Sequence, residues 1–236
     1  MNIPVWFTKP LTNREARLIR KNGFLPIVYP LIKINSYPTD DIFRQTQNAE
    51  KPDALLFTSR NAVNAFLSCR KVEPDWLSAV PVYSVGRKTQ QHLSESGISS
   101  VIAERQTGSG IAAKLISLFE KNTVIWHFCG NMKRPETGDM IQKGQLQYIP
   151  IECYETIELH NATFPEETYR AIVFYSPSAV RAFVYSKKLH APNVMIIGIG
   201  ETTANELRRL GFSDANEPEE PSTESVLQLL IEKFNT

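Results

Sequence analysis

The sequence has no marked excess of charge of either sign, and this absence narrows the class of protein. Its 236 residues include 26 Lys and Arg against 25 Asp and Glu, which leaves a formal net charge of +1. Nucleic-acid-binding domains usually have a basic excess, so we expect no nucleic-acid partner. No apolar run is long enough to span a bilayer, so we expect no membrane association. The first residues lack the basic segment and long apolar stretch of a secretory signal, which predicts a cytoplasmic protein.

Cysteine is scarce and irregularly spaced. The chain has Cys69, Cys129 and Cys153, with no C-x-x-C pair. An odd number without such spacing argues against a disulfide framework or a zinc site and favours reduced thiols in the cytoplasm. The histidines also lack metal-ligand spacing, so we expect no metal, and we interpret them as surface or packing residues: His92, His127, His160 and His190.

What the sequence does contain is a pattern that occurs twice. Residues 54–67 form an apolar run, a Thr-Ser turn and an amphipathic run, and residues 171–184 repeat this order with a Ser-Pro-Ser turn. Ser59 and Ser176 correspond, at an offset of 117 residues. Each copy is typical of a buried strand followed directly by a helix.

A second pair of segments follows in step with the first. One apolar strand leads to Gly86 and another to Gly200, each three residues before a threonine, Thr89 or Thr203. The offset is 114 residues in both cases. The helical stretch after each copy ends at a glycine. We therefore predict an internal repeat of one α/β unit.

The alternation of strands and helices along the chain predicts an α/β fold with parallel sheets covered by helices on both faces. The segment from Thr123 onward also resembles the N-terminal segment, with a strand, a polar loop, a helix, a glycine and a strand. We expect the chain to cross twice between two domains. One domain would consist of residues 1–34 and 155–236 and the other of 38–149, with linker strands near 34–38 and 149–155.

Five short motifs stand in a distinctive order: Phe57-Thr-Ser-x-x-Ala-Val63, Val85-Gly-x-x-Thr89, Cys153-Tyr-Glu-Thr156, Phe174-Tyr-Ser-Pro-Ser-Ala-Val180 and Ile199-Gly-x-Thr-Thr203. Each is weak alone, but their order, spacing and duplication resemble the uroporphyrinogen-III synthase family, nearly from end to end. The chain departs from the family pattern at Arg60, Lys9 and Tyr175, where proline, arginine, and threonine or serine are usual. These departures change side chains but leave the turns intact.

The resemblance implies a cofactor-free lyase of porphyrin and heme biosynthesis. Its fold would be two flavodoxin-like lobes joined by a two-stranded linker, with the active site in the cleft between them. Its substrate would be hydroxymethylbilane, a linear tetrapyrrole with an acetate and a propionate on every ring. The reaction would release water, invert ring D through a spiro intermediate and close the macrocycle to uroporphyrinogen III. The resemblance allows a transient hand-over from hydroxymethylbilane synthase, and we expect a monomer.

A nearly neutral chain that binds such a polyanion must use local groups. Helix N-termini offer unpaired N–H groups and a favourable dipole, about 0.3–1 kcal/mol per contact, and glycine lets the backbone approach closely. The candidate substrate-binding residues are Thr58, Ser59, Arg60, Gly86, Thr89, Ser176, Pro177, Ser178, Gly200, Thr202, Thr203 and Lys9. The plain alternative is that Ser59, Ser178 and Thr203 are ordinary N-caps, and Thr203 with Glu206 fits a capping box.

Tyr154 is the candidate catalytic residue, because it matches the tyrosine of the family motif. A phenol with a pKa of about 10 is protonated at neutral pH and can donate to a departing hydroxyl. The alternative is a strand tyrosine that only packs at a domain junction.

One rival function belongs to another class, a non-catalytic two-lobed cytosolic protein that binds a small anionic ligand. A dinucleotide is not the expected ligand, because the segment from Gly198 to Thr203 lacks the third glycine of the G-x-G-x-x-G fingerprint.

Overall fold

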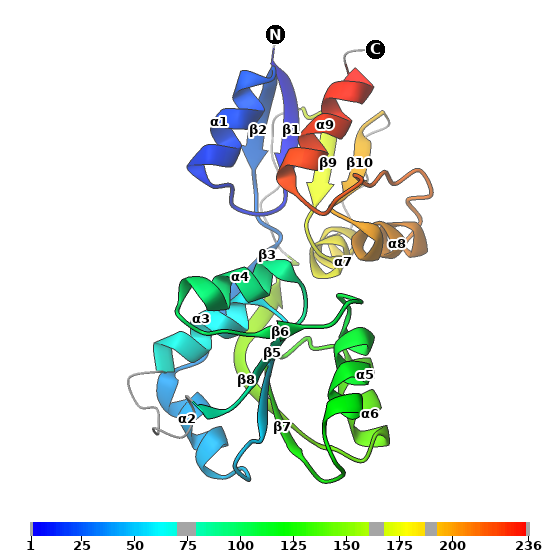
Figure 1. Ribbon diagram of the computed structural model, residues 1–236. Helices are drawn as coiled ribbons and strands as arrows, with labels where there is room; N and C mark the ends of the chain where they lie inside the picture. The colour runs from blue at the N-terminus through cyan, green and yellow to red at the C-terminus, as the bar shows by residue number, and fades with distance from the viewer. Residues whose placement is uncertain (1, 70–78, 161–167, 187–192, 235–236) are drawn as a thin grey trace. The chain divides into compact units, whose positions relative to one another are not determined.

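The computed structural model describes residues 2–69, 79–160, 168–186 and 193–234. The chain divides into two compact units (Figure 1). Unit 1 comprises Met1–Lys33 and Ile157–Thr236, and unit 2 comprises Ile34–Thr156. No helix in the described ranges is long and apolar enough to cross a membrane. The chain passes between the units twice, along β3 (Ile32–Ser36) and β8 (Gln147–Glu158), which are neighbours in one sheet.

Unit 1 is built on a four-stranded parallel sheet in the order β10-β9-β1-β2. The strands are β1 (Ile3–Phe7), β2 (Phe24–Val28), β9 (Ala171–Phe174) and β10 (Met195–Gly198). The helices are α1 (Asn13–Lys21), α7 (Pro177–Tyr185), α8 (Glu201–Arg209) and α9 (Thr223–Phe234).

The core of unit 1 follows from the two-residue period of its strands. Val5 and Phe7 pack with α1 and α9 on one face of the sheet. Trp6, between them, packs with α7 and α8 on the other face. All three side chains are fully buried, because both faces of a parallel sheet need a covering layer of helices.

Unit 2 contains a six-stranded sheet in the order β3-β8-β7-β4-β5-β6. Besides β3 and β8, its strands are β4 (Ala54–Phe57), β5 (Val82–Ser84), β6 (Val101–Ile102) and β7 (Val124–Gly130). Its helices are α2 (Thr39–Gln47), α3 (Arg60–Cys69), α4 (Arg87–Glu95), α5 (Gly108–Leu118) and α6 (Pro135–Lys143). Leu55 and Phe57 pack with α2, α3 and α4, and Ala54 and Leu56 pack with α5 and α6 on the opposite face (Figure 1).

The two units share one order of strands. The order β10-β9-β1-β2 in unit 1 matches β5-β4-β7-β8 in unit 2. Ser59 and Ser176 each accept a hydrogen bond from the amide three residues later, at the start of α3 and α7. Gly86 and Gly200 each stand directly before a helix, α4 or α8. The predicted repeat is therefore confirmed, although unit 1 takes its β1–α1–β2 portion from the other end of the chain.

A capping box forms at α1, but the one predicted at α8 does not form. At α1, the Thr12 side chain accepts from the Glu15 amide and the Glu15 carboxylate accepts from the Thr12 amide. At α8 the prediction is wrong, because the N-cap is Gly200 and Thr203 lies inside the first turn. The reason is the close packing of Gly198, where a Cβ atom would lie 2.6 Å from the Ala204 nitrogen, so the helix begins directly beside the strand end.

Candidate functional site

The candidate residues gather at the carboxyl ends of the parallel strands within each unit. In unit 2, Thr58 follows β4, Gly86 lies two residues after β5, and Tyr154 lies on β8 opposite the end of β7. In unit 1, Ser176 and Gly200 each lie two residues after a strand, β9 or β10. This edge of a parallel α/β sheet is where such folds bind ligands.

A β-bulge places Tyr154 beside the first helix turn of unit 2. Cys129 pairs with Glu152, but Gly130 pairs with Tyr154, so Cys153 is an extra residue in β8. Bulges commonly redirect a side chain near a site. The Tyr154 hydroxyl lies 3.0 Å from Ser59 Oγ.

Gly130 gives the Tyr154 ring its space. A Cβ atom at position 130 would lie 2.5 Å from Cε2 and Cζ of the ring. Burial raises the pKa of Tyr154, and the hydrogen bond with Ser59 only partly opposes this rise. The phenol is therefore a proton donor at neutral pH.

Thr58 belongs to a second hydrogen-bonded set in unit 2. Its Oγ1 lies 2.9 Å from His127 Nε2, and His127 Nδ1 lies 2.7 Å from the Tyr148 hydroxyl. His127 is only 2% exposed, and burial, helped by the charge of Lys133, lowers its pKa to about 4. The interpretation of His127 as a packing residue missed its contact with a candidate binding residue. The available signal was a polar residue inside the otherwise apolar strand β7.

The turns before α4 and α8 bury one threonine each. Thr89 and Thr203 occupy equivalent positions, and both are buried. Their amides donate to the carbonyl oxygens of Gly86 and Gly200, at 3.2 and 2.9 Å. Thr202, one residue earlier, is exposed. Arg60 is likewise exposed, at the first position of α3.

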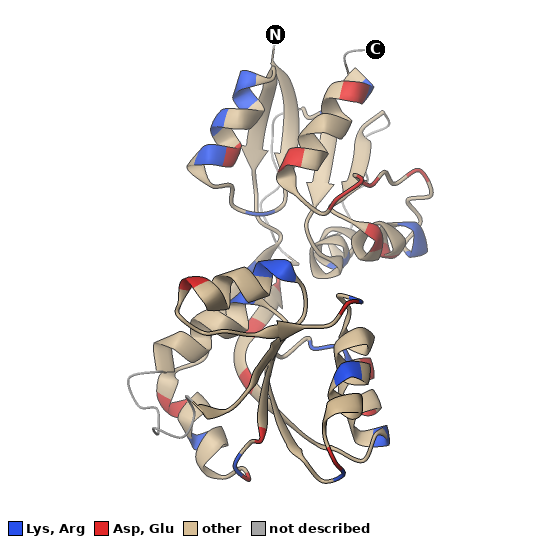
Figure 2. Cartoon of the chain, in the orientation of Figure 1, with Lys and Arg blue, Asp and Glu red and all other residues tan. Residues whose placement is uncertain are grey.

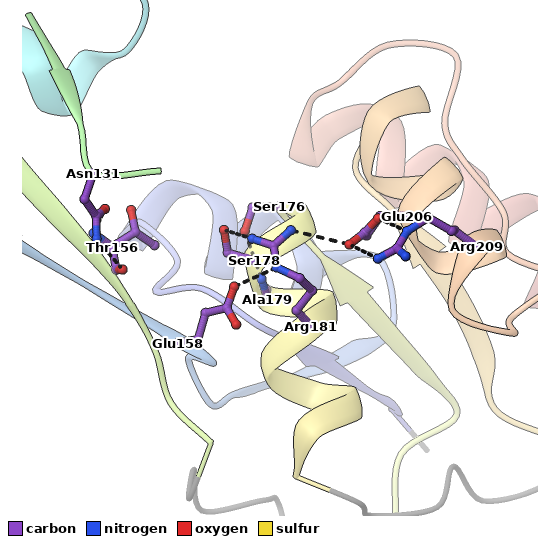
Figure 3. A network of polar contacts seen from close by, with 9 residues as sticks. All are labelled: Asn131, Thr156, Glu158, Ser176, Ser178, Ala179, Arg181, Glu206 and Arg209. Carbon is purple, nitrogen blue, oxygen red and sulfur yellow. Dashed lines mark hydrogen bonds and ion pairs between the residues drawn. The ribbon is translucent and has the colours of Figure 1, made fainter. Parts of the chain in front are cut away.

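In unit 1, Ser176 is the N-cap of α7 and Pro177 is its first residue. Ser178 is therefore not the N-cap. Its hydroxyl instead accepts a hydrogen bond from Arg181 Nη2 at 3.2 Å. Arg181 is also bound to Glu158 at 2.8 Å and to Glu206 at 3.4 Å (Figure 3).

Glu206 connects this cluster to a second arginine. Arg209 donates two hydrogen bonds to Glu206, at 2.8 and 2.9 Å. These bonds, and then the weaker contact with Arg181, lower the pKa of Glu206 despite its partial burial. Figure 3 also shows a pair in unit 2, in which the Thr156 amide donates to Asn131 Oδ1 at 2.9 Å. Sequence reasoning missed Arg181, because its importance depends on contacts with other elements.

Lys9 is engaged within unit 1. Its Nζ lies 3.0 Å from Glu15 Oε1 and 4.5 Å from the centre of the Tyr175 ring. Glu15 also accepts from Thr223 Oγ1 at 2.6 Å. Burial opposes the charge on Glu15, but hydrogen bonds from Thr223, Thr12 and Lys9 outweigh it and lower the pKa to about 2.

The distribution of charge and thiols limits the available chemistry. Figure 2 shows basic and acidic residues interspersed in unit 2 and basic residues concentrated on α1 in unit 1. Within the described ranges, which exclude His190, no three His, Cys, Asp or Glu side chains are grouped to hold a metal ion. Cys129 and Cys153 are free thiols, and burial raises the pKa of both to about 12, so they stay protonated.

These observations define a class of protein with two related α/β units, each with hydroxyl-bearing turns at the carboxyl edge of its sheet. The family model described as Uroporphyrinogen-III synthase HemD matches residues 13–228. The chain belongs to the uroporphyrinogen-III synthase family. No curated protein matches it in sequence.

Solved structures support the fold. Uroporphyrinogen-III synthetase from Helicobacter pylori is 20% identical with a TM-score of 0.70, and covers 99% of this chain and 100% of its own. A mutant uroporphyrinogen III synthase from Thermus thermophilus is 16% identical with a TM-score of 0.69, and covers 98% of each chain. The wild-type Form-2 crystal of the Thermus thermophilus enzyme is 18% identical with a TM-score of 0.56, over 99% of this chain and 98% of its own.

The family match confirms the predicted family, the α/β fold class and the cyclising lyase of porphyrin and heme biosynthesis. Nothing in these comparisons favours a non-catalytic binder of a small anion.

Proposed function

We propose that this chain converts hydroxymethylbilane to uroporphyrinogen III, with loss of water and inversion of ring D through a spiro intermediate. The family match over residues 13–228 supports this reaction. The observation in the structure that carries the proposal is the position of Tyr154, 3.0 Å from Ser59 at the carboxyl edge of the unit 2 sheet. A protonated phenol there can assist the departure of a hydroxyl group.

Tyr154 is the catalytic residue in this mechanism. As the C–O bond of the terminal hydroxymethyl group breaks, electrons from the pyrrole nitrogen form an azafulvenium ion, in which the nitrogen keeps its hydrogen. Tyr154 gives its proton to the leaving oxygen, which departs as water. The Ser59 hydroxyl can then donate to the phenolate oxygen and stabilise its charge. Because the substrate can expel hydroxide without help, we assign part of the rate enhancement to positioning of ring D.

The substrate-binding role belongs to the hydroxyl-bearing turns of both units. Thr58, Ser59 and the exposed Arg60 would contact carboxylates from unit 2, together with the backbone at Gly86. Ser176, Pro177, Ser178, Gly200 and Thr202 would do so from unit 1. We assign the buried Thr89 and Thr203 to holding the first helical turns in place. Lys9 would contribute while paired with Glu15, as a positive charge partly neutralised by that carboxylate.

We also propose that the two compact units are the predicted domains. The expected boundaries at residues 34–38 and 149–155 lie close to the observed divisions at Lys33/Ile34 and Thr156/Ile157. The enzyme would act as a monomer in the cytoplasm and would receive its unstable linear substrate by transient hand-over from hydroxymethylbilane synthase.

A coupled assay tests the function. Hydroxymethylbilane is generated in situ with the purified chain present, and the products are oxidised and separated as porphyrin isomers. Isomer III should dominate, because uncatalysed closure leaves ring D unturned and gives isomer I. Isomer I alone from a folded sample would overturn the proposal. Retention of the linear substrate by such a sample would then support the anion-binding alternative.

A further inference from the structure

Three side chains of unit 2, two on neighbouring strands and one directly after a third strand, form a continuous line of hydrogen bonds. His127 lies on β7, next to β4 on one side and β8 on the other. Its two ring nitrogens contact Thr58 Oγ1 at 2.9 Å and the Tyr148 hydroxyl at 2.7 Å. His127 is almost fully buried, and Thr58 is half-buried in the turn that also holds Ser59. The line therefore runs from the interior to the candidate site.

The chemistry of imidazole restricts how protons are arranged along this line. A neutral ring has one N–H donor and one acceptor nitrogen. Burial keeps the His127 ring neutral by lowering its pKa, and it keeps the Tyr148 phenol protonated by raising its pKa. Two arrangements are then possible, and they give Thr58 opposite roles.

In the first arrangement, Tyr148 donates to Nδ1 and the Nε2–H group donates to Thr58 Oγ1. The Thr58 hydrogen is then free to donate to a ligand. In the second, Nδ1–H donates to Tyr148 and Thr58 donates to Nε2. The Tyr148 hydrogen would then need another acceptor, but in the described part of the chain its hydroxyl has no hydrogen-bond partner except His127. An unsatisfied donor in a partly buried position costs about 1–3 kcal/mol, so the first arrangement is favoured.

The Tyr148 ring is held in place to serve this arrangement. It packs against Gly138 of α6, where a Cβ atom would lie 2.6 Å from Cε1 of the ring. The ring centroids of His127 and Tyr148 lie 5.7 Å apart. The Tyr148 ring therefore cannot rotate away from His127 without repacking.

We propose that Tyr148 and His127 are positioning residues that orient the Thr58 hydroxyl as a hydrogen-bond donor to a carboxylate of the substrate. The inference rests on the proposed function, because it assigns the polyanionic tetrapyrrole as the acceptor. Tyr148 fixes the tautomer of His127, and the tautomer fixes the direction in which Thr58 donates. Neither residue needs to touch the substrate.

The tautomer can be measured without any assay of activity. The chain has four histidines, so nitrogen NMR of ¹⁵N-histidine-labelled protein gives few signals, and His127→Gln identifies those of His127. The parent should carry its proton on Nε2. In Tyr148→Phe, Nδ1 loses its partner in both arrangements, so the preference for Nε2 should weaken and the proton should distribute between both nitrogens. A parent His127 ring protonated on Nδ1 would overturn this proposal, in which the line of hydrogen bonds from Tyr148 through His127 to Thr58 acts as a relay.

Kinetics then test the role of Thr58. Thr58→Val should raise KM on the order of tenfold, the value of one hydrogen bond to a charged group, and Tyr148→Phe should raise it by a smaller factor, with kcat nearly unchanged in both. The double variant should show no further increase. Tyr83→Phe, which removes a phenol from the same unit outside the relay, should leave KM unchanged. An unchanged KM in folded Tyr148→Phe would also overturn the relay.

The two proposals fail separately. If the parent protein makes isomer III while His127 carries its proton on Nδ1, the proposed function stands and the proposed role of Tyr148 and His127 is overturned. If the parent protein has the expected tautomer but makes only isomer I, the proposed function is overturned. The proposed role of Tyr148 and His127 is then overturned as well, because it requires that substrate.

Discussion

The phenol oxygen of Tyr154 lies 3.0 Å from Ser59 Oγ, although 95 residues separate them in sequence. Tyr154→Phe removes only this hydroxyl. Because a positioned acid typically contributes 10²–10⁴ in rate, we expect kcat to fall by about 100-fold with little change in stability. The isomer assay measures the rate, and Tyr83→Phe is the matched control for loss of a buried phenol. Turnover within a factor of two of the parent would remove the acid role from Tyr154.

Gly130 is the residue that gives the Tyr154 ring room. Gly130→Ala would place a methyl group 2.5 Å from two ring carbons, so the ring must move away from Ser59. We expect kcat to fall about as far as it does in Tyr154→Phe. The double variant should be no slower than either single one, because both changes remove the same placed hydroxyl. Additive losses would show that Gly130 acts by another route.

The buried His127 should make unit 2 sensitive to mild acid. Its folded-state pKa of about 4 lies below the ordinary value of 6.5, so below pH 6.5 the unfolded chain binds a proton that the folded chain excludes. Stability is therefore fully present above pH 6.5 and is lost as pH falls toward 4, by up to about 3 kcal/mol. Hydrogen exchange of β4 and β7 at pH 7 and pH 4.5, corrected for intrinsic rates, measures this loss.

The control for this experiment is a histidine in an exposed position. His127→Gln should reduce the difference in hydrogen-exchange protection between pH 7 and pH 4.5, whereas His160→Gln should leave that difference as it is in the parent. An equal loss of protection in all three proteins would assign the acid sensitivity to other groups.

Glu15 should make unit 1 sensitive to stronger acid. Its pKa of about 2 lies below the ordinary value of 4.5, so its contribution is present above pH 4.5 and is lost as pH falls toward 2. Because solvent screens the charge of this incompletely buried carboxylate, we expect a contribution of only about 2 kcal/mol at neutral pH, less than the full shift would give. Chemical unfolding measures the free energy of unfolding at pH 7 and at pH 3. The difference between the two values should be smaller in Glu15→Gln than in the parent. Glu219→Gln, an exposed carboxylate of the same unit, should behave like the parent.

Arg181 connects described residues on three elements, β8, α7 and α8. Its guanidinium contacts Glu158, Glu206 and Ser178 at distances of 2.8 to 3.4 Å. Arg181→Lys keeps the charge but cannot bridge all three, because an ammonium lacks the planar fork. We expect a loss of about 1–2 kcal/mol in stability and a raised KM through displacement of Ser178. Arg208→Lys is the control on α8. Equal increases in KM in the two variants would show that the position of Ser178 does not depend on Arg181.

Much of the fold could be predicted because its signals are local. The apolar runs of the strands, the Ser59 cap and the glycines before α4 and α8 all lie within a few residues of what they determine. The capping box at Thr203 failed for the opposite reason. The start of α8 is decided by contact between Gly198 and the helix, and a short sequence pattern does not record that contact.

The site was predictable as a set of turns but not as a set of contacts. The bond between Arg181 and Glu206 joins α7 to α8, and its counterpart in unit 2 joins Asn64 Oδ1 to His92 Nε2 at 2.5 Å. These pairs are related by the same offsets, 117 and 114, that relate the repeated motifs. The repeat therefore locates the second pair once the first is known, but no residue type in either pair reveals the contact beforehand.

The permuted order of the repeat has a consequence for synthesis on the ribosome. Unit 2 is one uninterrupted segment, so all of its strands are available as soon as Thr156 has emerged. β1 and β2 are made first, yet their sheet neighbour β9 and their covering helix α9 are made only after unit 2 is complete. Domains generally fold as units during synthesis. β1 and β2, which can pair with each other, must therefore wait without β9 and α9 until the segment from Ile157 onward completes unit 1.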